Sequence, residues 1–332
     1  MRLISFFLLI LFYSFNAYSN IDTEFEKWKN EFKIFALANG VSEKTYLKTI
    51  PNVKFLPKVI EYDRFQPEFY EDTKTYISKR TSEAKVKKGL EFYNNNKDLI
   101  NEIETKYKID KELLLALMGI ETNFGTYVGK MDILSSLATL SFDKRRSEFF
   151  SNELLTLLKL IDQNLVNYET LYGSWAGAFG FFQFMPSTIQ NYAIDYNKDD
   201  FIDLKNPIDA YASAANYLNK IGWNNTEPCY YKIDLNKDIP KKYLNVSAKK
   251  LHNKNKANFF KKYINNYSKL EISGENLLSS IITPDKDIIP DAETLNPAYI
   301  VFGNYEVILK WNRSLRFGLA VCTLKDKFKN EL

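Results

Sequence analysis

The sequence predicts a mainly α protein of the α+β type, in which a helical chain carries one small mixed segment. Apolar residues recur at helical spacing through residues 22–100, as expected for amphipathic helices. An almost unbroken apolar run, Leu113–Ile120, suits a buried helix. Residues 229–290 show neither of these two helical patterns, because Lys and Asn are frequent there and prolines separate short apolar runs.

Residues 1–19 have the composition of a secretory signal peptide. One Arg precedes an apolar stretch, and Ala17 and Ser19 are small residues that suit the −3 and −1 positions of a cleavage site. An uncleaved anchor is the alternative, although the run is shorter than the ~20 residues that a membrane span requires. No Cys follows the run, so we expect an exported protein without a lipid anchor and, after cleavage, without a transmembrane span.

Composition argues against several kinds of site. The net charge of +4 comes from scattered Lys rather than from a basic helix, so we expect no nucleic-acid partner. The single histidine, His252, lies in a Lys- and Asn-rich stretch, which disfavours catalytic triads and zinc sites. Cys229 and Cys322 are too few for a metal cluster, and a disulfide and two buried free thiols both remain open.

Residues 20–100 are predicted to form a helical N-terminal domain. A first helix stops at Gly40, Ser42 caps a short second helix, and Asp63–Pro67 interrupts the pattern. A long charged helix is expected from about Asp72 to Asn96.

Residues 101–228 are predicted to form the core of the protein. Helices are expected after a cap at Asp110, over Ile133–Leu140 and Phe149–Asn164, at Pro186, and from Asn206-Pro207 to a stop at Gly222. Between them, Gly173–Ser187 is rich in Gly and aromatic residues, and its glycines allow close backbone approach.

The remaining chain is predicted to hold a small mixed or β insertion at residues 229–295 and the C-terminal part of the core at residues 296–332. Within that last part, Tyr305–Leu309 is typical of a strand because β-branched and aromatic residues dominate it. Arg313–Phe328 is again typical of a helix.

Glu121 is the strongest candidate for a catalytic residue. It ends the apolar run and shares one helix face with Leu113 and Leu117, eight and four residues earlier. A carboxylate in such a place is unfavourable unless it is neutral, paired or used. Burial and the negative end of the helix both raise a carboxyl pKa, so this position suits an acid that donates a proton.

An acidic loop has the spacing of an EF-hand. Oxygen-bearing side chains and one backbone carbonyl recur at alternating positions, in the pattern that wraps Ca²⁺. The candidate ligands are Asp195, Asn197, Asp199, the Phe201 carbonyl, Asp203 and Asn206. The loop departs from the pattern at Asp200, where Gly is usual, and at Asn206, where a bidentate Glu is usual. The alternative is a solvated turn in which Asn206 caps the next helix.

Several motifs in consistent order resemble the lytic murein transglycosylases of the B family. They are Tyr62–Phe69, Gly119–Gly125, Ala138–Phe142 with Arg145-Arg146, Gly173–Ser187, the loop at Asp195, Ala214–Leu218 and Asn304–Ser314. The resemblance covers about residues 24–225 and 296–328 and is weak over 229–290. It implies a lysozyme-like helical core, a helical N-terminal domain and a small β-containing insertion.

The resemblance also implies an activity. The family cleaves the β-1,4 bond between N-acetylmuramic acid and N-acetylglucosamine in peptidoglycan and leaves 1,6-anhydromuramic acid ends. The single catalytic acid of the family falls on Glu121, which would act as acid and then as base. No cofactor is then needed for chemistry, peptidoglycan strands are the partner, and the location is periplasmic. Partners in a cell-wall enzyme complex stay open.

Further site residues follow only from the resemblance. Those that line the sugar cleft are Ser174, Gln183, Phe184, Tyr217, Trp311 and Asn312, and those that contact the anionic strand or its peptide are Arg145 and Arg146. Trp311 and Phe317 stand where the family more often has Tyr, so ring stacking is kept and the hydroxyls are absent.

Two alternatives use the same motifs differently. A hydrolytic muramidase would cleave the same bond with a second acid or a positioned water. A non-catalytic peptidoglycan-binding protein would not need Glu121. Gly173–Ser187 contains no Asp or Glu, which agrees with a reaction that uses one acid.

Overall fold

The computed structural model describes residues 21–66, 70–270, 272–286 and 295–332. The predicted signal peptide therefore lies outside the described residues. Within those ranges, no helix combines the length and the apolar composition that crossing a membrane requires. The chain folds into two compact units. The first comprises residues up to Arg64, Val128–Asn191 and Lys198–Ile202, and the second comprises Phe65–Tyr127, Tyr192–Asn197 and Asp203–Leu332.

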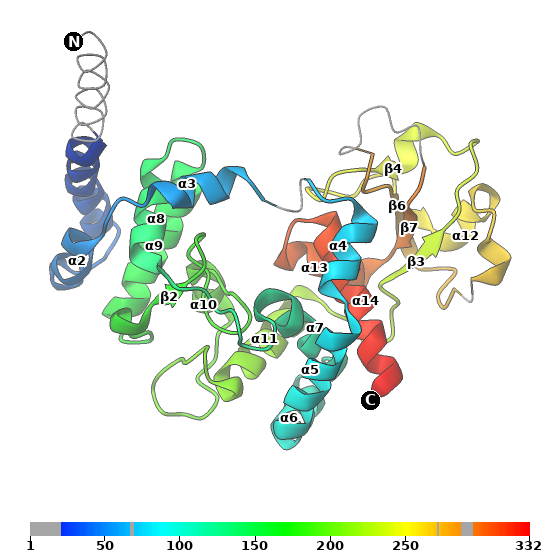
Figure 1. Ribbon diagram of the computed structural model, residues 1–332, viewed down its shortest axis with the longest axis horizontal. Coiled ribbons are helices and arrows are strands. Elements are labelled where there is room, and N and C mark those ends of the chain that lie inside the picture. Colours follow the sequence, from blue (N-terminus) through cyan, green and yellow to red (C-terminus); the bar gives the residue numbers. More distant parts are fainter. Residues whose placement is uncertain (1–20, 67–69, 271, 287–294) are drawn as a thin grey trace, which may run out of the picture. The chain divides into compact units, whose positions relative to one another are not determined.

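The first unit is a group of helices with one small strand pair. Residues 21–38 are helical. The further elements are α2 (Glu43–Thr49), η1 (Ile50–Asn52), α3 (Pro57–Arg64), α8 (Ile133–Phe142), α9 (Ser147–Asp162), η3 (Tyr168–Thr170) and most of α10 (Pro186–Tyr192). Strands β1 (Met131–Asp132) and β2 (Tyr172–Gly173) pair antiparallel. Helices α8 and α9 lie side by side (Figure 1), and α3 packs on α8.

The predicted cap of α2 is confirmed and is tied to α9. Ser42 Oγ accepts the Thr45 N–H at 3.1 Å. Asp162 is the last residue of α9. Its carboxylate accepts the Ser42 N–H at 2.8 Å and the hydroxyls of Ser42 and Thr45, each at 2.6 Å. These hydrogen bonds favour the ionised form and lower the pKa of Asp162, so one carboxylate joins two helices.

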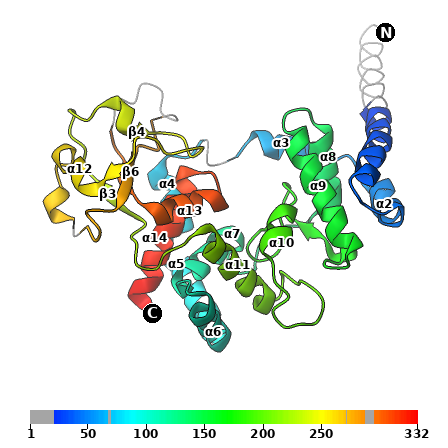
Figure 2. The same ribbon diagram turned by 180° about the vertical axis from the view of Figure 1, so that it is seen from behind.

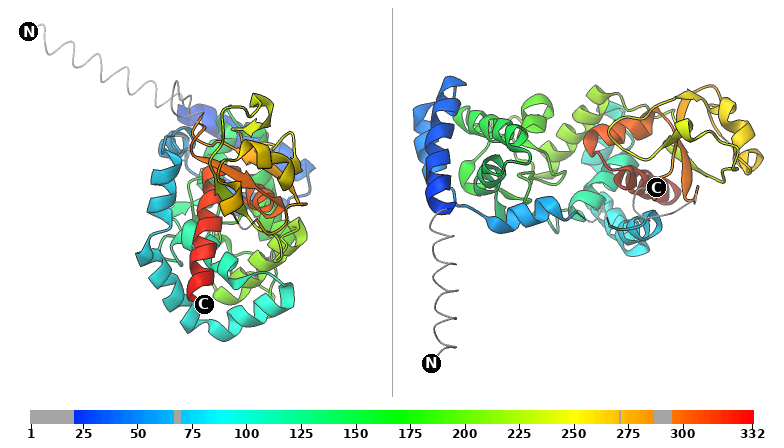
Figure 3. Two further views of the ribbon diagram at one scale, coloured as in Figure 1. Left: turned by 90° about the vertical axis from the view of Figure 1, so that its right-hand side faces the viewer. Right: turned by 90° about the horizontal axis from the view of Figure 1, so that it is seen from above.

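The second unit is built around the C-terminal helix. Its helices are α4 (Thr73–Arg80), α5 (Glu83–Asn95), α6 (Lys97–Tyr107), α7 (Lys111–Thr122), α11 (Pro207–Ile221), α13 (Gly303–Trp311) and α14 (Leu315–Glu331). Helix α14, red in Figures 2 and 3, packs against α4, α5, α7 and α13. The predicted start and stop of α11 are confirmed: Asn206 caps it, and Gly222 ends it with φ of 98°.

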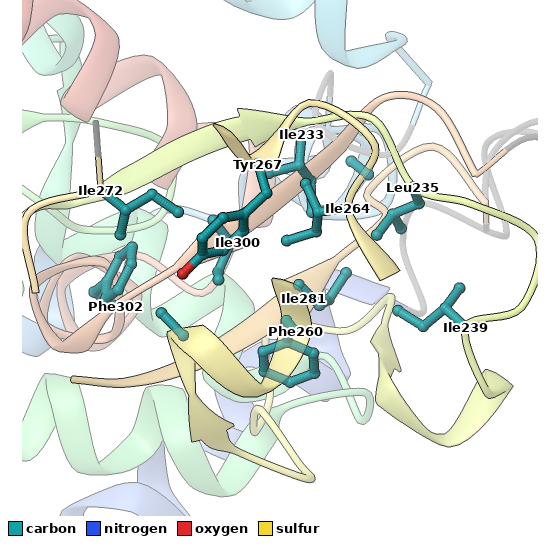
Figure 4. Packing of buried hydrophobic residues seen from close by; sticks show 12 residues of the cluster. Ile233, Leu235, Ile239, Phe260, Ile264, Tyr267, Ile272, Ile281, Ile300 and Phe302 are labelled. Carbon is teal, nitrogen blue, oxygen red and sulfur yellow. The ribbon is translucent and has the colours of Figure 1, made fainter. Parts of the chain in front are cut away.

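A small sheet in the second unit has its own core. Its strands are β3 (Tyr230–Ile233), β4 (Leu244–Asn245), β5 (Asn255–Lys256), β6 (Leu278–Ile282) and β7 (Ala298–Val301), with the short helices α12 (Ala257–Phe260), η4 (Lys241–Tyr243), η5 (Lys261–Tyr263) and η6 (Tyr267–Lys269). The order is β3-β7-β6-β4, with β5 also on β6, and only the β4–β6 pair is parallel. Ile233, Phe260, Ile281 and Ile300 are fully buried in this core (Figure 4). The mainly helical fold with a small β part is confirmed.

The two cysteines, whose state the sequence leaves open, form a disulfide. Cys229 directly precedes β3 and Cys322 lies in α14, with their Cα atoms 6.2 Å apart. The bond therefore fastens the start of the sheet to the central helix of the second unit.

Two predicted elements are wrong. Asp72–Asn96 is not one helix, because Ser82 begins α5 as a cap that accepts the Lys85 N–H at 3.3 Å. Tyr305–Leu309 is not a strand but part of α13. A Cβ on Gly318 would lie 2.8 Å from the Tyr305 ring, so the missing side chain lets α13 pack closely on α14, and this packing overrides the strand-like composition.

A buried polar network joins three distant segments of the second unit. Asp285, 5% exposed, accepts the Thr73 N–H at 2.9 Å and the Thr73 hydroxyl at 2.5 Å. Arg316 Nη2 donates to Asp285 at 3.0 Å and to the Pro284 carbonyl at 2.7 Å. The network links α4 and α14 to the residues that follow β6.

Candidate active site

The turn that follows α7 holds Glu121 at the end of its helix. Asn123 and Phe124 both have positive φ, of 50° and 58°, and reverse the chain. Thr122 Oγ donates to the Met118 carbonyl at 3.2 Å and accepts the Gly125 N–H at 3.1 Å. A Cβ on Gly119 would lie 2.8 Å from the Phe124 ring. The Gly119–Gly125 motif is therefore a hydrogen-bonded turn in which Gly119 leaves room for the buried Phe124 ring.

Glu121 lies at the boundary between the core and solvent. Leu113 and Leu117 on the same helix face are fully buried, as predicted, and Glu121 itself is half-buried. The Trp311 indole Nε1–H donates to Glu121 Oε1 at 3.0 Å. This contact joins the end of α7 to the end of α13 and fixes the orientation of the carboxyl group.

Three stacked aromatic rings support that contact. Tyr192 stacks on Tyr217 with ring centroids 4.4 Å apart, and Tyr217 stacks on Trp311 at 5.0 Å. The Tyr217 hydroxyl donates to the Lys310 carbonyl at 3.3 Å. Burial raises the pKa of Tyr217 to about 12, so the phenol stays neutral at ordinary pH. Tyr192 is a residue that sequence reasoning missed, because nothing local marks it as the end of a stack.

The structure brings together Glu121, Tyr217 and Trp311 from the predicted set. Asn312 directly follows Trp311, and its N–H donates to the Ile308 carbonyl at 3.0 Å at the end of α13. The absent hydroxyl at Trp311 does not remove a donor from the site, because the indole N–H supplies one. Phe317, the other departure, is buried at 3% exposure and packs in the core.

The other predicted cleft residues share one loop of the first unit. Ser174 Oγ accepts the Ala178 N–H at 3.1 Å. Gln183 has a positive φ of 50°. Its side-chain amide Nε2–H group donates to the carbonyls of Val128 and Gly180 at 3.3 and 2.8 Å. Phe184 pairs with Phe179 through the backbone and is 3% exposed. Backbone groups of the loop itself and of Val128 therefore hold its polar side chains in place, and the substrate roles stay predictions.

Arg145 and Arg146 share one buried partner in the first unit. Asp63, 2% exposed, accepts hydrogen bonds from both guanidinium groups, including Arg145 Nε at 2.8 Å. Arg145 also donates to the Asp63 carbonyl at 2.6 Å. Asp63 was not among the predicted site residues. Each Arg has five N–H donors, so contact with an anionic strand remains a prediction alongside this anchoring role.

The acidic loop is closed by a carboxylate outside the predicted ligand set. Asp209, fully buried, accepts the N–H groups of Tyr196 at 2.8 Å, Asn197 at 3.4 Å and Asp203 at 3.0 Å. It stands three residues after the cap Asn206, at the position where a capping box has Glu or Gln, but it accepts N–H groups of the loop instead of the Asn206 N–H, which donates to the Asp203 carbonyl at 3.0 Å. Asp200 adopts the expected left-handed conformation, with φ of 66°.

The predicted calcium ligands all offer oxygen atoms, but some of these atoms already accept hydrogen bonds. They divide between the units: Asp199 and Phe201 belong to the first, and Asp195, Asn197, Asp203 and Asn206 to the second. Asn206 Oδ1 accepts the Ile208 N–H at 3.0 Å, the capping role that was the alternative. Across the described residues, no three His, Cys, Asp or Glu side chains converge as a metal site. The donor set nevertheless suits Ca²⁺, which prefers oxygen ligands.

Several known proteins are similar to this chain. The chain is similar to membrane-bound lytic murein transglycosylase B of Escherichia coli (strain K12), with 40% identity over 149 residues, which are 45% of this chain and 41% of that protein. It therefore spans less than half the length of that relative. A structure of SltB3 from Pseudomonas aeruginosa in complex with NAG-NAM-pentapeptide has a TM-score of 0.80 and 31% identity, and covers 92% of this chain and 79% of that one.

A third relative was solved with a metal ion. The Escherichia coli lytic transglycosylase Slt35 in complex with calcium has a TM-score of 0.74 and 26% identity, and covers 91% of this chain and 93% of that chain. Finally, residues 24–326 match the family described as the transglycosylase SLT domain. That match spans nearly the whole chain, and the chain therefore belongs to the transglycosylase SLT domain family.

Proposed function

We propose that the protein is a peptidoglycan lytic transglycosylase that cleaves the β-1,4 bond between N-acetylmuramic acid and N-acetylglucosamine. The observation that carries the proposal is the Glu121 carboxyl group, half-buried at the end of α7 and bonded to the Trp311 indole at 3.0 Å. It lies in a chain of the transglycosylase SLT domain family. The site thus offers one oriented acid beside a set of stacked rings suited to a sugar face.

One carboxyl group is sufficient for the reaction. Protonated Glu121 donates its proton to the glycosidic oxygen as the bond from that oxygen to C1 of the muramic residue breaks. The resulting carboxylate then takes the proton of the muramic O6 hydroxyl while O6 bonds to C1. A 1,6-anhydro ring forms, no water is consumed, and Glu121 is protonated again. The Trp311 N–H stabilises the carboxylate between the two steps, because a hydrogen bond to an ionised group favours that form.

Digestion of purified sacculi tests this proposal. Mass spectrometry of the products should show ends that are lighter by one water than reducing ends. Reducing ends alone would instead identify a muramidase, which hydrolyses the same bond. Binding to sacculi without release of fragments would identify a peptidoglycan-binding protein.

Trp311→Phe should lower the rate of strand cleavage by about tenfold, because it removes a hydrogen bond to a charged group while keeping an aromatic ring. Initial rates on soluble glycan strands measure the effect. Trp223→Phe is a matched control, since Trp223 Nε1 also donates to a carboxylate, that of Asp110, at 3.1 Å. Equal losses in the two variants would contradict a specific role of the Trp311 N–H.

We infer that the loop at residues 195–206 takes a structural Ca²⁺, held by the oxygen atoms of Asp195, Asn197, Asp199, Phe201, Asp203 and Asn206. The all-oxygen donor set supports this, and Slt35 was solved with calcium. The melting temperature should then rise with Ca²⁺ concentration and fall in a chelator. Asp195→Asn should reduce the rise, and an unchanged melting temperature at millimolar Ca²⁺ would count against the site.

We also propose that the protein acts in the periplasm after export. The composition of residues 1–19 supports export, and a disulfide is typical of an oxidising compartment. Fractionation of cells that produce the full chain, followed by N-terminal sequencing of the mature protein, would test both the location and the cleavage site.

A further inference from the structure

One face of α5 binds the turn that carries Glu121. Helix α5 packs against α7 (Figure 1), and two of its lysines bond to residues 119–126, which are called the Glu121 turn below. Lys85 Nζ donates to the Gly119 carbonyl at 2.7 Å, and Lys88 Nζ donates to the Thr126 hydroxyl. Residues three apart lie on the same helix face, so α5 holds the turn at a residue before Glu121 and at a residue after it.

The same face of α5 also packs on the ring inside the Glu121 turn. Gly89 and Phe92 follow Lys85 by four and seven residues, which keeps them on its face. A Cβ on Gly89 would lie 2.6 Å from the Phe124 ring, and the centroids of the Phe92 and Phe124 rings are 6.1 Å apart. Phe124 is 7% exposed. Close packing therefore sets the register between α5 and the turn, and this register brings Lys85 to the Gly119 carbonyl.

Lys85 supplies a positive charge where the backbone is negative. Carbonyl groups at the end of a helix carry partial negative charge and are short of partners within the helix. The Gly119 carbonyl accepts the Asn123 N–H at 3.2 Å, and Lys85 adds a second, charged donor. Burial, and then the charges of Arg80 and Lys88, lower the pKa of Lys85. Its bond partner is a backbone carbonyl and not a carboxylate, so the effect of Lys85 falls on the conformation of the turn.

We propose that Lys85 is a positioning residue that sets the direction of the Glu121 carboxyl group. The inference rests on the proposed function and adds a residue that acts through the backbone. Gly119 lies two residues before Glu121, so a change at its carbonyl turns the end of α7 and the carboxyl group with it. Trp311 holds the same group from α13, through an N–H bond of 3.0 Å. Reacting groups need to be held within about 0.5 Å of their working position, and Lys85 and Trp311 together provide this from two helices.

Kinetics of neutral variants test the proposal. Lys85→Met should lower kcat on soluble glycan strands by about tenfold, because a displaced acid reacts less well. KM should stay within about twofold of the wild type, since the stacked rings are unchanged. Lys85→Arg should restore kcat to within about threefold of the wild type, since it keeps a charged N–H donor. Lys87→Met is the matched control, because Lys87 is an exposed lysine of the same helix, and it should behave as the wild type.

Rates in this comparison are divided by the folded fraction from circular dichroism, so that lost stability does not count as lost activity. Lys85→Gln, which is also neutral, gives the same test if Lys85→Met does not fold. An unchanged kcat in the neutral variant, or a loss that Lys85→Arg does not restore, would overturn the proposal.

A spectroscopic experiment separates failure of this proposal from failure of the proposed function, because it requires no cleavage. The indole N–H signals of isotope-labelled protein are assigned with Trp311→Phe and Trp223→Phe. Lys85→Met should move the Trp311 signal, because the acceptor of that N–H is displaced. It should leave the Trp223 signal in place, because that acceptor precedes the first turn of α7. A Trp311 signal that moves no more than the Trp223 signal would overturn the proposal, whether or not the wild type cleaves glycan strands.

Discussion

Replacing Glu121 with Gln should lower strand cleavage by about 1,000-fold, because general acid–base catalysis by one group contributes about 10²–10⁴-fold. The amide keeps the size of the side chain, and its oxygen can still accept the Trp311 N–H. It can neither donate the proton to the glycosidic oxygen nor take one from the O6 hydroxyl. Release of soluble fragments from sacculi measures the loss.

The control variant is Glu112→Gln in the first turn of the same helix. Glu112 lies 3.7 Å from Lys111 and is partly exposed, so its loss should affect neither stability nor cleavage strongly. Retention of more than about a tenth of the activity in Glu121→Gln would contradict its role as the sole acid. Binding of sacculi should persist in this variant, because the stacked rings are unchanged.

The Asp285→Ala variant should lower the free energy of unfolding by about 3–5 kcal/mol, because it leaves a buried cation unpaired. Arg316 is 6% exposed, and the Thr73 N–H and hydroxyl would also lose their acceptor. Urea denaturation followed by circular dichroism measures the change. The exposed Asp238→Ala variant is the control and should change stability by less than about 0.5 kcal/mol.

A double variant tests whether the side chains of Asp285 and Arg316 are energetically coupled. Replacing both partners by apolar residues, Asp285→Leu with Arg316→Met, removes the unpaired charge and should restore part of the lost stability. A double variant that is as unstable as the sum of its single variants would show that the two side chains are not coupled.

Local signals in the sequence predicted the helices around the site well. The apolar run before Glu121, the cap at Asn206 and the stop at Gly222 each depend on residues within one or two turns of one another, and all three are found. Asp110 shows the limit of such signals. It stands at the cap position of α7, but its carboxyl group accepts the Trp223 indole N–H instead of capping.

Contacts between distant segments could not be predicted in the same way. Trp311 and Glu121 are 190 residues apart, and Thr73 and Asp285 are 212 residues apart. Such pairs depend on packing, which has no local pattern in the chain. The error at Tyr305 has the same origin, since its strand-like composition gives way to packing against α14.

The pairing of β3 with β7 has a consequence for how the protein could change. Tyr230 faces Val301 across two antiparallel strands, so the chain enters and leaves the sheet about 5 Å apart. The segment between them is a cassette with neighbouring ends, and Asp285 within it is held to the rest of the unit by hydrogen bonds from Thr73 and Arg316. Glu121 lies outside this cassette. Relatives can therefore differ in the length of the cassette, away from Asp285, while the acid remains in place.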